Sequence, residues 1–394
     1  MIYLDHNATT RPLPEVIATM GACQANAWAN PSSRHALGQS VRAWMVAARA
    51  DVAALVGAQP VEVVFTSGAT EANHHALHGA LHRSGAPRRV LLSAVEHAGY
   101  LASALRLREE GVEVSLLPVD ACGRVSPRVL QEALRDKAAL VSVMAANNET
   151  GVLQPVADLA VIARAHGVPF HVDATQCAGK LPVDFAALGA DLLSLSAHKL
   201  HGPKGSGALV IRKGLSWPSL IAGRQERARR GGTENVAGIV GFGVAAQHAR
   251  TALSERAARL GGLRDQLEAG LATCFGDRLL VHGHAAARLP NTSCISLAGL
   301  SAEKVLRHLE RRGIFASSGA ACSSGGTEPS HVLIAMGVPA SVAHGAVRLS
   351  LGSETSEEEI AETLGAFASL AAEPAAVAPP PPQTNTQPTS GALA

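Results

Sequence analysis

The chain has 394 residues, of which 47% are hydrophobic and 17% are charged, and its formal net charge is +2 at pH 7. This length and apolar share predict a globular protein of two domains, or of one large domain with an appendage. The near-neutral charge indicates neither a nucleic-acid partner nor a membrane partner. Six scattered cysteines and an N-terminus without a signal-peptide pattern predict reduced thiols and a cytoplasmic location.

The first two thirds of the chain predict a mostly parallel sheet covered by helices. Residues 1–12 are polar and turn-rich, so we expect them to reach across to the smaller domain. A helical pattern through Val41, Met45 and Val52 comes next. Apolar runs separated by helical stretches then indicate strands at residues 61–65, 89–93, 112–117, 140–144, 170–173, 192–195 and 208–211. Alternation of this kind is typical of α/β proteins.

The pattern changes after about residue 260. A long charged helix leads to spaced strands near residues 293–297 and 347–351, which predicts a second, smaller α+β domain. We therefore expect an N-terminal segment at 1–12, a large cofactor-binding domain at 13–260 and a small domain at 261–373. Residues 374–394 are rich in proline and lack periodicity, which predicts a disordered tail.

Polar side chains occur where the predicted strands end. Ser196, His198 and Lys199 follow the strand at 192–195. A lysine in this setting can be desolvated and linked to a carbonyl cofactor, although a surface lysine before a turn gives the same local pattern. The turn at 66–70 leads into a helix, where backbone N–H groups and hydroxyls suit a phosphate. The alternative is an ordinary turn in which Thr70 caps the helix.

Two more strand ends complete this set. Asp173 and Gln176 follow the strand at 170–173, and a carboxylate in such a buried position needs a partner such as a protonated pyridine nitrogen. His97 could stack on a ring or carry protons, or it could simply cap a helix. Together with the amides of residues 146–151, these groups fit pyridoxal phosphate.

Cys322 is surrounded by small residues, because Ser317-Ser-Gly-Ala-Ala precedes it and Ser-Ser-Gly-Gly326 follows. A structural cysteine prefers burial among apolar side chains. The composition therefore favours an exposed thiol in a mobile loop, suited to act as a nucleophile, over a structural cysteine.

Several motifs follow one another in an order that is shared with a known family. They are Leu4-Asp-His-Asn-Ala-Thr-Thr10, Asn30-Pro-Ser-Ser33, Phe65-Thr-Ser-Gly-Ala-Thr-Glu71, Glu96-His97, Asn147-Asn-Glu-Thr-Gly151, Asp173-Ala-Thr-Gln176, Ser196-Ala-His-Lys199, Gln225-Glu226, Gly232-Thr-Glu-Asn235 and Ser317-Ser-Gly-Ala-Ala-Cys322. With them the chain resembles the cysteine desulfurases, in the class whose catalytic cysteine lies in a long flexible loop. Lys199-Leu-His201, Arg288-Leu-Pro-Asn-Thr-Ser293 and Glu328-Pro-Ser-His331 are similar to its nitrogen-fixation (NifS) branch.

The resemblance implies the fold of type I pyridoxal-phosphate-dependent transferases and gives the site residues their roles. Lys199 would bond covalently to the cofactor and move protons, and His97 would stack over the ring as an acid and base. Asp173 would pair with the ring nitrogen, and Gln176 with the phenolic oxygen. The residues that would hold the phosphate are Thr70, Ser196, His198 and the partner's Thr233 in a homodimer.

The resemblance also implies a substrate and a product. Asn148 and Arg348 would bind the carboxylate of L-cysteine, and Cys322 would take its sulfur as a persulfide and leave L-alanine. The sulfur would pass to an acceptor such as an iron–sulfur scaffold protein, for general cluster assembly or for nitrogenase. No resident metal is expected, although Cys322 could contact an iron–sulfur cluster transiently.

Two other readings stay open. A different enzyme of the same fold, such as a selenocysteine lyase or an aminotransferase, would keep Lys199 and Asp173 but would not need Cys322. A non-catalytic protein descended from the fold would be expected to have lost Lys199 or His97, and this chain has both.

Overall fold

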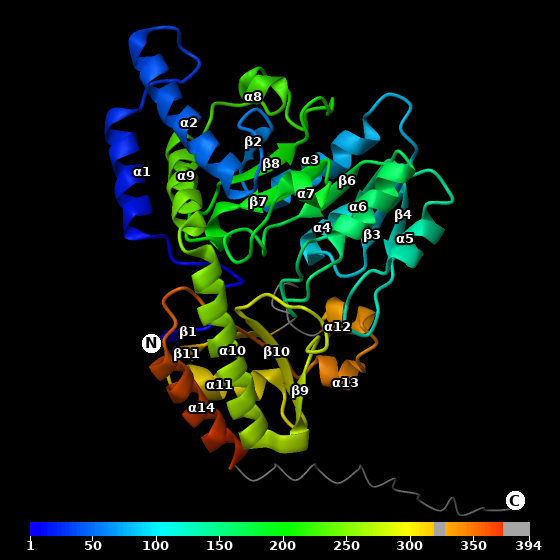
Figure 1. Ribbon diagram of the computed structural model, residues 1–394, viewed down its shortest axis with the longest axis vertical. Coiled ribbons are helices and arrows are strands. Elements are labelled where there is room, and N and C mark those ends of the chain that lie inside the picture. The colour runs from blue at the N-terminus through cyan, green and yellow to red at the C-terminus, as the bar shows by residue number, and fades with distance from the viewer. Residues whose placement is uncertain (319–327, 373–394) are drawn as a thin grey trace, which may run out of the picture.

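The computed structural model describes residues 1–318 and 328–372, which form a large lobe and a small lobe joined by one long helix (Figure 1). That helix is α10 (Leu253–Phe275), so the predicted domain limit at 260/261 falls within a continuous helix. The tail at 374–394 and Cys322 lie outside the described residues.

Seven described strands form the sheet of the large lobe. Their order across the sheet is β2 (Val63–Thr66), β8 (Gly207–Ile211), β7 (Leu192–Ser196), β6 (Phe170–Asp173), β5 (Leu140–Ser142), β3 (Arg89–Ser93) and β4 (Glu113–Leu117). Strands β7, β6, β5, β3 and β4 pair in parallel, and only β8 runs against its neighbours. The predicted α/β class with a mostly parallel sheet is therefore confirmed.

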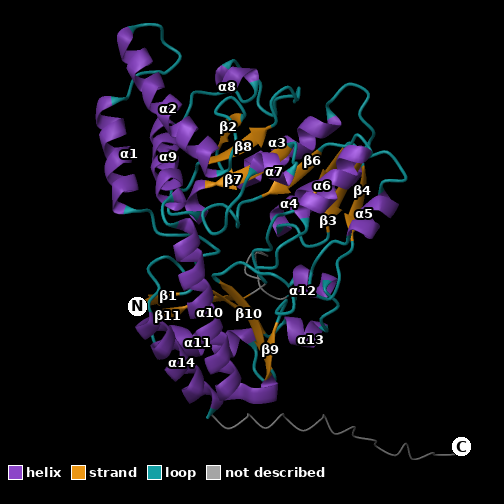
Figure 2. Cartoon of the chain, in the orientation of Figure 1, coloured by secondary structure: helices purple, strands orange, loops and turns teal. Residues whose placement is uncertain are grey.

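Helices cover both faces of this sheet (Figure 2). The helices described in this lobe are α1 (Pro14–Asn26), α2 (Ala36–Leu55), α3 (Ala69–Leu81), α4 (Ala98–Arg106), α5 (Pro127–Ala133), α6 (Val156–Ala165), α7 (Phe185–Leu188), α8 (Gln225–Ala228) and α9 (Val236–Arg250). Leu91 packs into a core with α2, α6 and α9, whereas its neighbours Val90 and Leu92 pack with α3 and α4. Because successive strand residues point to opposite faces, a strand covered on both sides is apolar throughout, as the sequence predicted.

The small lobe is an antiparallel sheet with helices on it. The sheet order is β12 (Ser317–Ser318), β13 (Ala346–Ser350), β10 (Thr292–Leu297) and β9 (Leu279–Val281). The helices are α11 (Ala302–Glu310), α12 (His331–Ala335), α13 (Ala340–Ala343) and α14 (Glu357–Ala371). Leucines of α10 share one apolar core with α11, α14 and β13.

The N-terminal segment connects the two lobes. Strand β1 (Ile2–Tyr3) pairs in parallel with β11 (Ile314–Phe315), and Asp5 forms a bridge with Ser350 of β13. A few residues later the backbone N–H of Thr10 donates to the carbonyl of His198 in the large lobe, at 2.9 Å. Residues 4–10 therefore cross the gap between the lobes.

One strand is shorter than its apolar run suggested. The run at 140–144 predicted five residues, but β5 ends at Ser142. Backbone hydrogen bonds to β6 continue beyond this point, from Val143 to His171 at 3.0 Å and from Ala145 to Asp173 at 2.8 Å. Between them, the backbone N–H of Met144 donates to the buried Glu96 carboxylate at 2.6 Å and not to a strand on its other side.

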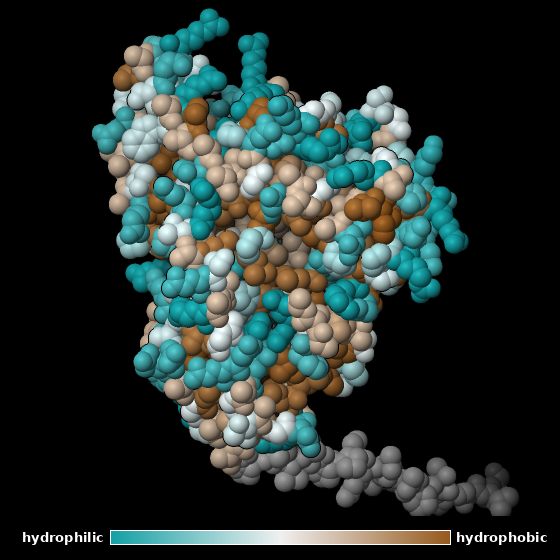
Figure 3. Space-filling view, viewed as in Figure 1, coloured by the Kyte–Doolittle hydropathy of each residue, from teal (hydrophilic) through white to brown (hydrophobic). Residues whose placement is uncertain are grey.

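Within the described ranges, no helix has both the length and the apolarity needed to cross a bilayer. On the face seen in Figure 3, apolar and hydrophilic residues are interspersed over both lobes.

Candidate active site

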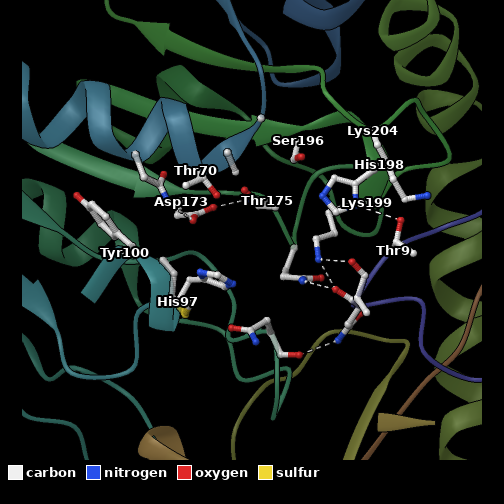
Figure 4. Close-up of a pocket in the computed structure, with 18 of the residues that line it drawn as sticks. Thr9, Thr70, His97, Tyr100, Asp173, Thr175, Ser196, His198, Lys199 and Lys204 are labelled. Atoms are coloured by element: carbon white, nitrogen blue, oxygen red, sulfur yellow. Dashed lines mark hydrogen bonds between the residues drawn. The ribbon is translucent and has the colours of Figure 1, made fainter. Parts of the chain in front are cut away.

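A cavity of about 520 Å³ lies where the parallel strands of the large lobe end. This edge of an open α/β sheet is where ligands usually bind. Nine of the predicted site residues line the cavity, namely Thr70, His97, Asn148, Asp173, Gln176, Ser196, His198, Lys199 and Arg348. Figure 4 shows Asp173 and His97 on one side, with His198 and Lys199 on the other.

Two predicted residues are not among those that line the cavity. Thr233 is exposed in an adjoining depression of about 250 Å³, which shares Ser67 and Gly205 with the cavity. The described chain thus places Thr233 next to its own site but not in it. The other residue is Cys322, which lies outside the described residues.

Lys199 lies in the short 3₁₀ turn Ala197–Lys199 that follows β7. Its ammonium group donates to the backbone carbonyls of Asn7 and Ala8, at 2.8 Å to Ala8. The side chain is half-buried. The N-terminal segment therefore holds the amine inside the cavity.

One end of the cavity is suited to a phosphate. The N-terminus of α3, with Gly68 and Thr70, faces Ser196, and a β-carbon built on Gly68 would lie 3.9 Å from the Ser196 hydroxyl. His198 and Lys204 line the same region. Helix N-terminal N–H groups, hydroxyls and a cation together attract a dianion.

Asp173 lies across the cavity from His198 and Lys199 (Figure 4) and is 6% exposed. Its carboxylate accepts from the amide of Asn73 at 2.7 Å and from the backbone N–H of Thr175 at 2.9 Å. These bonds fix the carboxylate for a cationic partner such as a protonated ring nitrogen. Asn73 was not predicted, although it follows Thr70 by one helical turn and so shares its face of α3.

His97 caps α4, and its Nδ1 accepts from the backbone N–H of Gly99 at 3.2 Å. In the neutral ring the proton is therefore on Nε2. Burial lowers the pKa of His97, Asp173 opposes this shift, and Lys199 adds to it. The ring is thus a neutral base near pH 7, which can stack on an aromatic cofactor.

Arg348 of β13 brings a buried cation from the small lobe. Its Nη1 donates to the carbonyl of Asn148 at 3.1 Å, and its Nη2 donates to the Asp5 carboxylate at 2.6 Å. Its Nε is buried and has no partner among the described groups. An arginine with a spare buried donor fits a substrate carboxylate.

These groups fit pyridoxal phosphate. The phosphate cup, formed by the start of α3 with Thr70, Ser196, His198 and Lys204, suits the phosphate, and Asp173 suits the ring nitrogen. The Lys199 amine reaches into the same cavity, where an aldehyde could be bound. Tyr100 and Met144 add apolar surface to the cavity, and neither was predicted from the sequence. Both are core residues in the local pattern, so only the fold shows their place.

The described cysteines are not placed for chemistry in this cavity, because none of the five lines it. Burial raises the pKa of the Cys177 thiol to about 12 and also raises the pKa of Cys294. A protonated, buried thiol is a poor nucleophile.

Known proteins of similar sequence and structure agree with this interpretation of the site. The model of the family "Aminotransferase class-V" matches residues 2–362. A cysteine desulfurase of Rhodobacter capsulatus is 45% identical over 94% of this chain and 97% of its own length. A solved NifS-like protein superimposes with a TM-score of 0.86 at 36% identity, covering 94% of this chain and 98% of that one. SspA, solved in complex with cysteine, gives a TM-score of 0.79 at 32% identity, covering 89% and 99%.

Proposed function

The chain belongs to the class-V aminotransferase family, and we propose that it is a cysteine desulfurase that uses pyridoxal phosphate to convert L-cysteine to L-alanine. One observation carries the proposal: Lys199, Asp173 and Arg348 face a single cavity. They supply a covalent anchor, a partner for the ring nitrogen and a carboxylate binder. The similarity to cysteine desulfurases and to SspA in complex with cysteine supports the choice of substrate.

Each side chain has a task in this reaction. Bound pyridoxal phosphate supplies an electron-withdrawing ring. Asp173 keeps the ring nitrogen protonated, and Gln176 donates to the phenolic oxygen. Lys199 holds and moves the proton of the substrate's α-carbon, with His97 as a second acid and base. Asn148 and Arg348 orient the substrate by its carboxylate.

Sulfur transfer needs a nucleophile, and we assign that role to Cys322. Its thiolate attacks the substrate sulfur, so that a sulfur–sulfur bond forms while the bond from sulfur to the β-carbon breaks. The electron pair stays on the carbon, which takes up a proton and becomes the methyl group of alanine. The burial and raised pKa of Cys177 support this choice over the cysteine nearest to the cofactor residues in sequence.

The active unit in this proposal is a homodimer, in which the partner's Thr233 completes the phosphate site. Apolar side chains exposed on and beside α1 and α2 support a second copy there, including Ile17, Trp28, Leu37 and Val46. The persulfide passes its sulfur in the cytoplasm to an acceptor such as an iron–sulfur scaffold protein. The motifs of the NifS branch and the similarity to a NifS-like protein support cluster assembly, with nitrogenase as one destination.

The test is to incubate the purified protein with L-cysteine and to measure alanine and sulfide with and without a reductant. Alanine should form in both cases, and sulfide release should need the reductant, which discharges the persulfide. Cys322→Ser should still bind the cofactor but should release no sulfide. If Cys322→Ser desulfurates cysteine as fast as the wild type, the protein is a lyase that does not use this thiol.

A further inference from the structure

Asn7 belongs to residues 4–10, the segment that crosses between the two lobes, and it is buried. All four of its polar groups are hydrogen-bonded. The backbone N–H donates to the Ser350 hydroxyl at 3.0 Å. The backbone carbonyl accepts from Lys199 and, at 3.0 Å, from the amide of Gln176. The side-chain oxygen accepts from Lys180 at 3.0 Å and from Asn291 at 3.1 Å. The side-chain nitrogen donates to the Asn148 carbonyl at 3.2 Å and to the Thr292 hydroxyl at 2.9 Å.

These partners come from both lobes. Lys199, Gln176, Lys180 and Asn148 belong to the large lobe, whereas Ser350, Asn291 and Thr292 belong to the small lobe. Asn7 also lines the cavity itself. One residue therefore ties three of the proposed site residues to the framework of the small lobe.

The orientation of the Asn7 amide follows from its neighbours. The Asn291 amide nitrogen, identified by its bond to the Leu351 carbonyl at 3.0 Å, can only donate, so the Asn7 atom that faces Asn291 and Lys180 is the oxygen. The Thr292 hydroxyl donates its proton to the Asn291 oxygen at 3.0 Å, so towards Asn7 it can only accept. The atom that faces Thr292 is therefore the Asn7 nitrogen. Aspartate could not donate on that side, and alanine would satisfy neither side.

Lys180 also contacts Gln176. The residue is 9% exposed, and its Nζ donates to the Gln176 side-chain oxygen at 2.6 Å. The Gln176 nitrogen therefore points the other way, towards the Asn7 carbonyl and the cavity. Burial lowers the pKa of Lys180 to about 7, and the charge of nearby Lys199 adds to the shift. Neutral oxygens of Asn7 and Gln176 are what hold this amine.

We infer that Asn7 is a positioning residue for the reaction, because its side chain fixes the backbone carbonyl that holds the Lys199 amine. The same side chain sets the Asn148 carbonyl, which also accepts from Arg348 at 3.1 Å. Asn7 thus places the reactive amine and the carboxylate binder relative to each other. The inference rests on the proposed function for the roles of those two residues.

The test compares three variants that disturb this anchor with one that does not. Asn7→Ala removes the side chain, and Asn7→Asp keeps its shape but loses the donor. Thr292→Val removes one anchor of Asn7 without touching the cavity, which Thr292 does not line. The matched control is Ser296→Ala, on the same strand β10, whose hydroxyl bonds only His282 and the Val342 carbonyl among the described groups.

The main readout does not depend on turnover. Pyridoxal phosphate is added to the cofactor-free protein, and the label fixed on Lys199 by borohydride is followed in time by peptide mapping. Because misplacing a reacting group by about 1 Å can cost up to about a hundredfold, both Asn7 variants should slow this capture by roughly ten- to a hundredfold. Thr292→Val should slow it less, and Ser296→Ala should not slow it although its unfolding temperature falls.

Steady-state kinetics add a second readout, since the Asn7 variants should lower kcat and raise KM for L-cysteine together. The inference is overturned if all three variants capture the cofactor as fast as Ser296→Ala and lose only thermal stability. Should Asn7→Ala fail to fold, Asn7→Asp and Thr292→Val decide the question. A wild type that captures the cofactor but makes no alanine from cysteine would refute the proposed function and leave the capture result standing.

Discussion

At the scale of single residues, the site depends on side chains that reach one cavity from distant parts of the chain. Lys199, Asp173 and His97 lie at or just after three predicted strands, and all three line the cavity. Asn7 and Lys180 could not be predicted in the same way, because their roles depend on partners far along the chain. The bond from Asn7 to Ser350 spans 343 residues, and no periodicity in the sequence records it.

Lys199→Ala should abolish covalent attachment of the cofactor while leaving its phosphate cup intact. The cofactor would then bind only non-covalently, and alanine formation should fall by roughly 10²–10⁴-fold or more, because the same amine moves the α-proton. Borohydride reduction and peptide mapping check this, with Lys204→Ala as the control that keeps the label. A label found on Lys204 in the wild type would refute the assignment.

Glu149 should make the protein less stable as the pH rises. Burial raises the pKa of this carboxyl to about 7, against the opposing effects of Ser330 and Arg348, whereas the unfolded chain titrates near 4.5. Below pH 4.5 both states are protonated. Between pH 4.5 and 7 Glu149 loses its proton only in the unfolded state, which stabilises that state. The free energy of unfolding therefore falls by about 3 kcal/mol by pH 7.

The glutamine of Glu149→Gln cannot ionise, so the stability of this variant does not fall with pH for that reason. Its free energy of unfolding relative to wild type should therefore rise between pH 4.5 and 7 and level off above. Urea unfolding at several pH values and one fixed protein concentration measures the difference, with the exposed Glu15→Gln as control. A difference that does not change with pH would show that Glu149 is ionised in the folded protein.

At the scale of elements, the strands of the large lobe follow from the sequence because burial on both faces leaves uninterrupted apolar runs. The run at 89–93 coincides with β3. Helix α9 was not predicted, because it is buried on nearly all sides and has no amphipathic period. A β-carbon on its Gly243 would lie 2.6 Å from the α-carbon of Ala48, so the helix packs unusually close to α2.

The packing of β8 against the start of α3 should control cofactor binding. A β-carbon on Gly207 would lie 2.6 Å from both the Gly68 α-carbon and the Leu195 carbonyl oxygen, and backbone cannot move aside cheaply. Gly207→Ala should therefore displace the phosphate cup, weaken cofactor binding and cost about 1–3 kcal/mol of stability. Equilibrium dialysis with pyridoxal phosphate and thermal unfolding measure the two effects.

Gly365→Ala in α14 is the matched control, because nothing lies within 4 Å of its added β-carbon. It should leave cofactor affinity unchanged and stabilise the helix by about 0.5–1 kcal/mol. Unchanged affinity in Gly207→Ala would mean that the cup does not depend on this contact.

At the scale of the whole molecule, the site is assembled from both lobes and cannot be located by local pattern alone. Arg348 and Ser350 come from β13, whereas Lys199 follows β7. The resemblance to a known family did predict that Arg348 and Lys199 share one site, because such a resemblance concerns the whole fold and not a local pattern. Residues 1–12, which the sequence shows only as polar and turn-rich, are what join the two lobes at the cavity.

In the proposed dimer, the partner's Thr233 would complete the phosphate site. Thr233 is exposed in the single chain, so Thr233→Asp should fold normally while its charge repels the phosphate. Homodimers of Lys199→Ala or of Thr233→Asp should each be defective. In a mixed dimer of the two, one site would combine an intact Lys199 with an intact Thr233 from the opposite subunit. Such dimers, isolated with two different tags, should show up to about half of the wild-type activity, since one of two sites works.

The reciprocal pairing makes the result decisive. In the second mixed dimer, one chain carries both substitutions and the other chain is wild type. If each site takes Thr233 from the partner, both sites of this dimer are defective. If Thr233 served its own chain instead, the doubly substituted mixed dimer would keep half of the activity and the first mixed dimer would have none. The two mixed dimers thus give opposite outcomes for the two arrangements, and alanine formation from L-cysteine distinguishes them without any structural measurement.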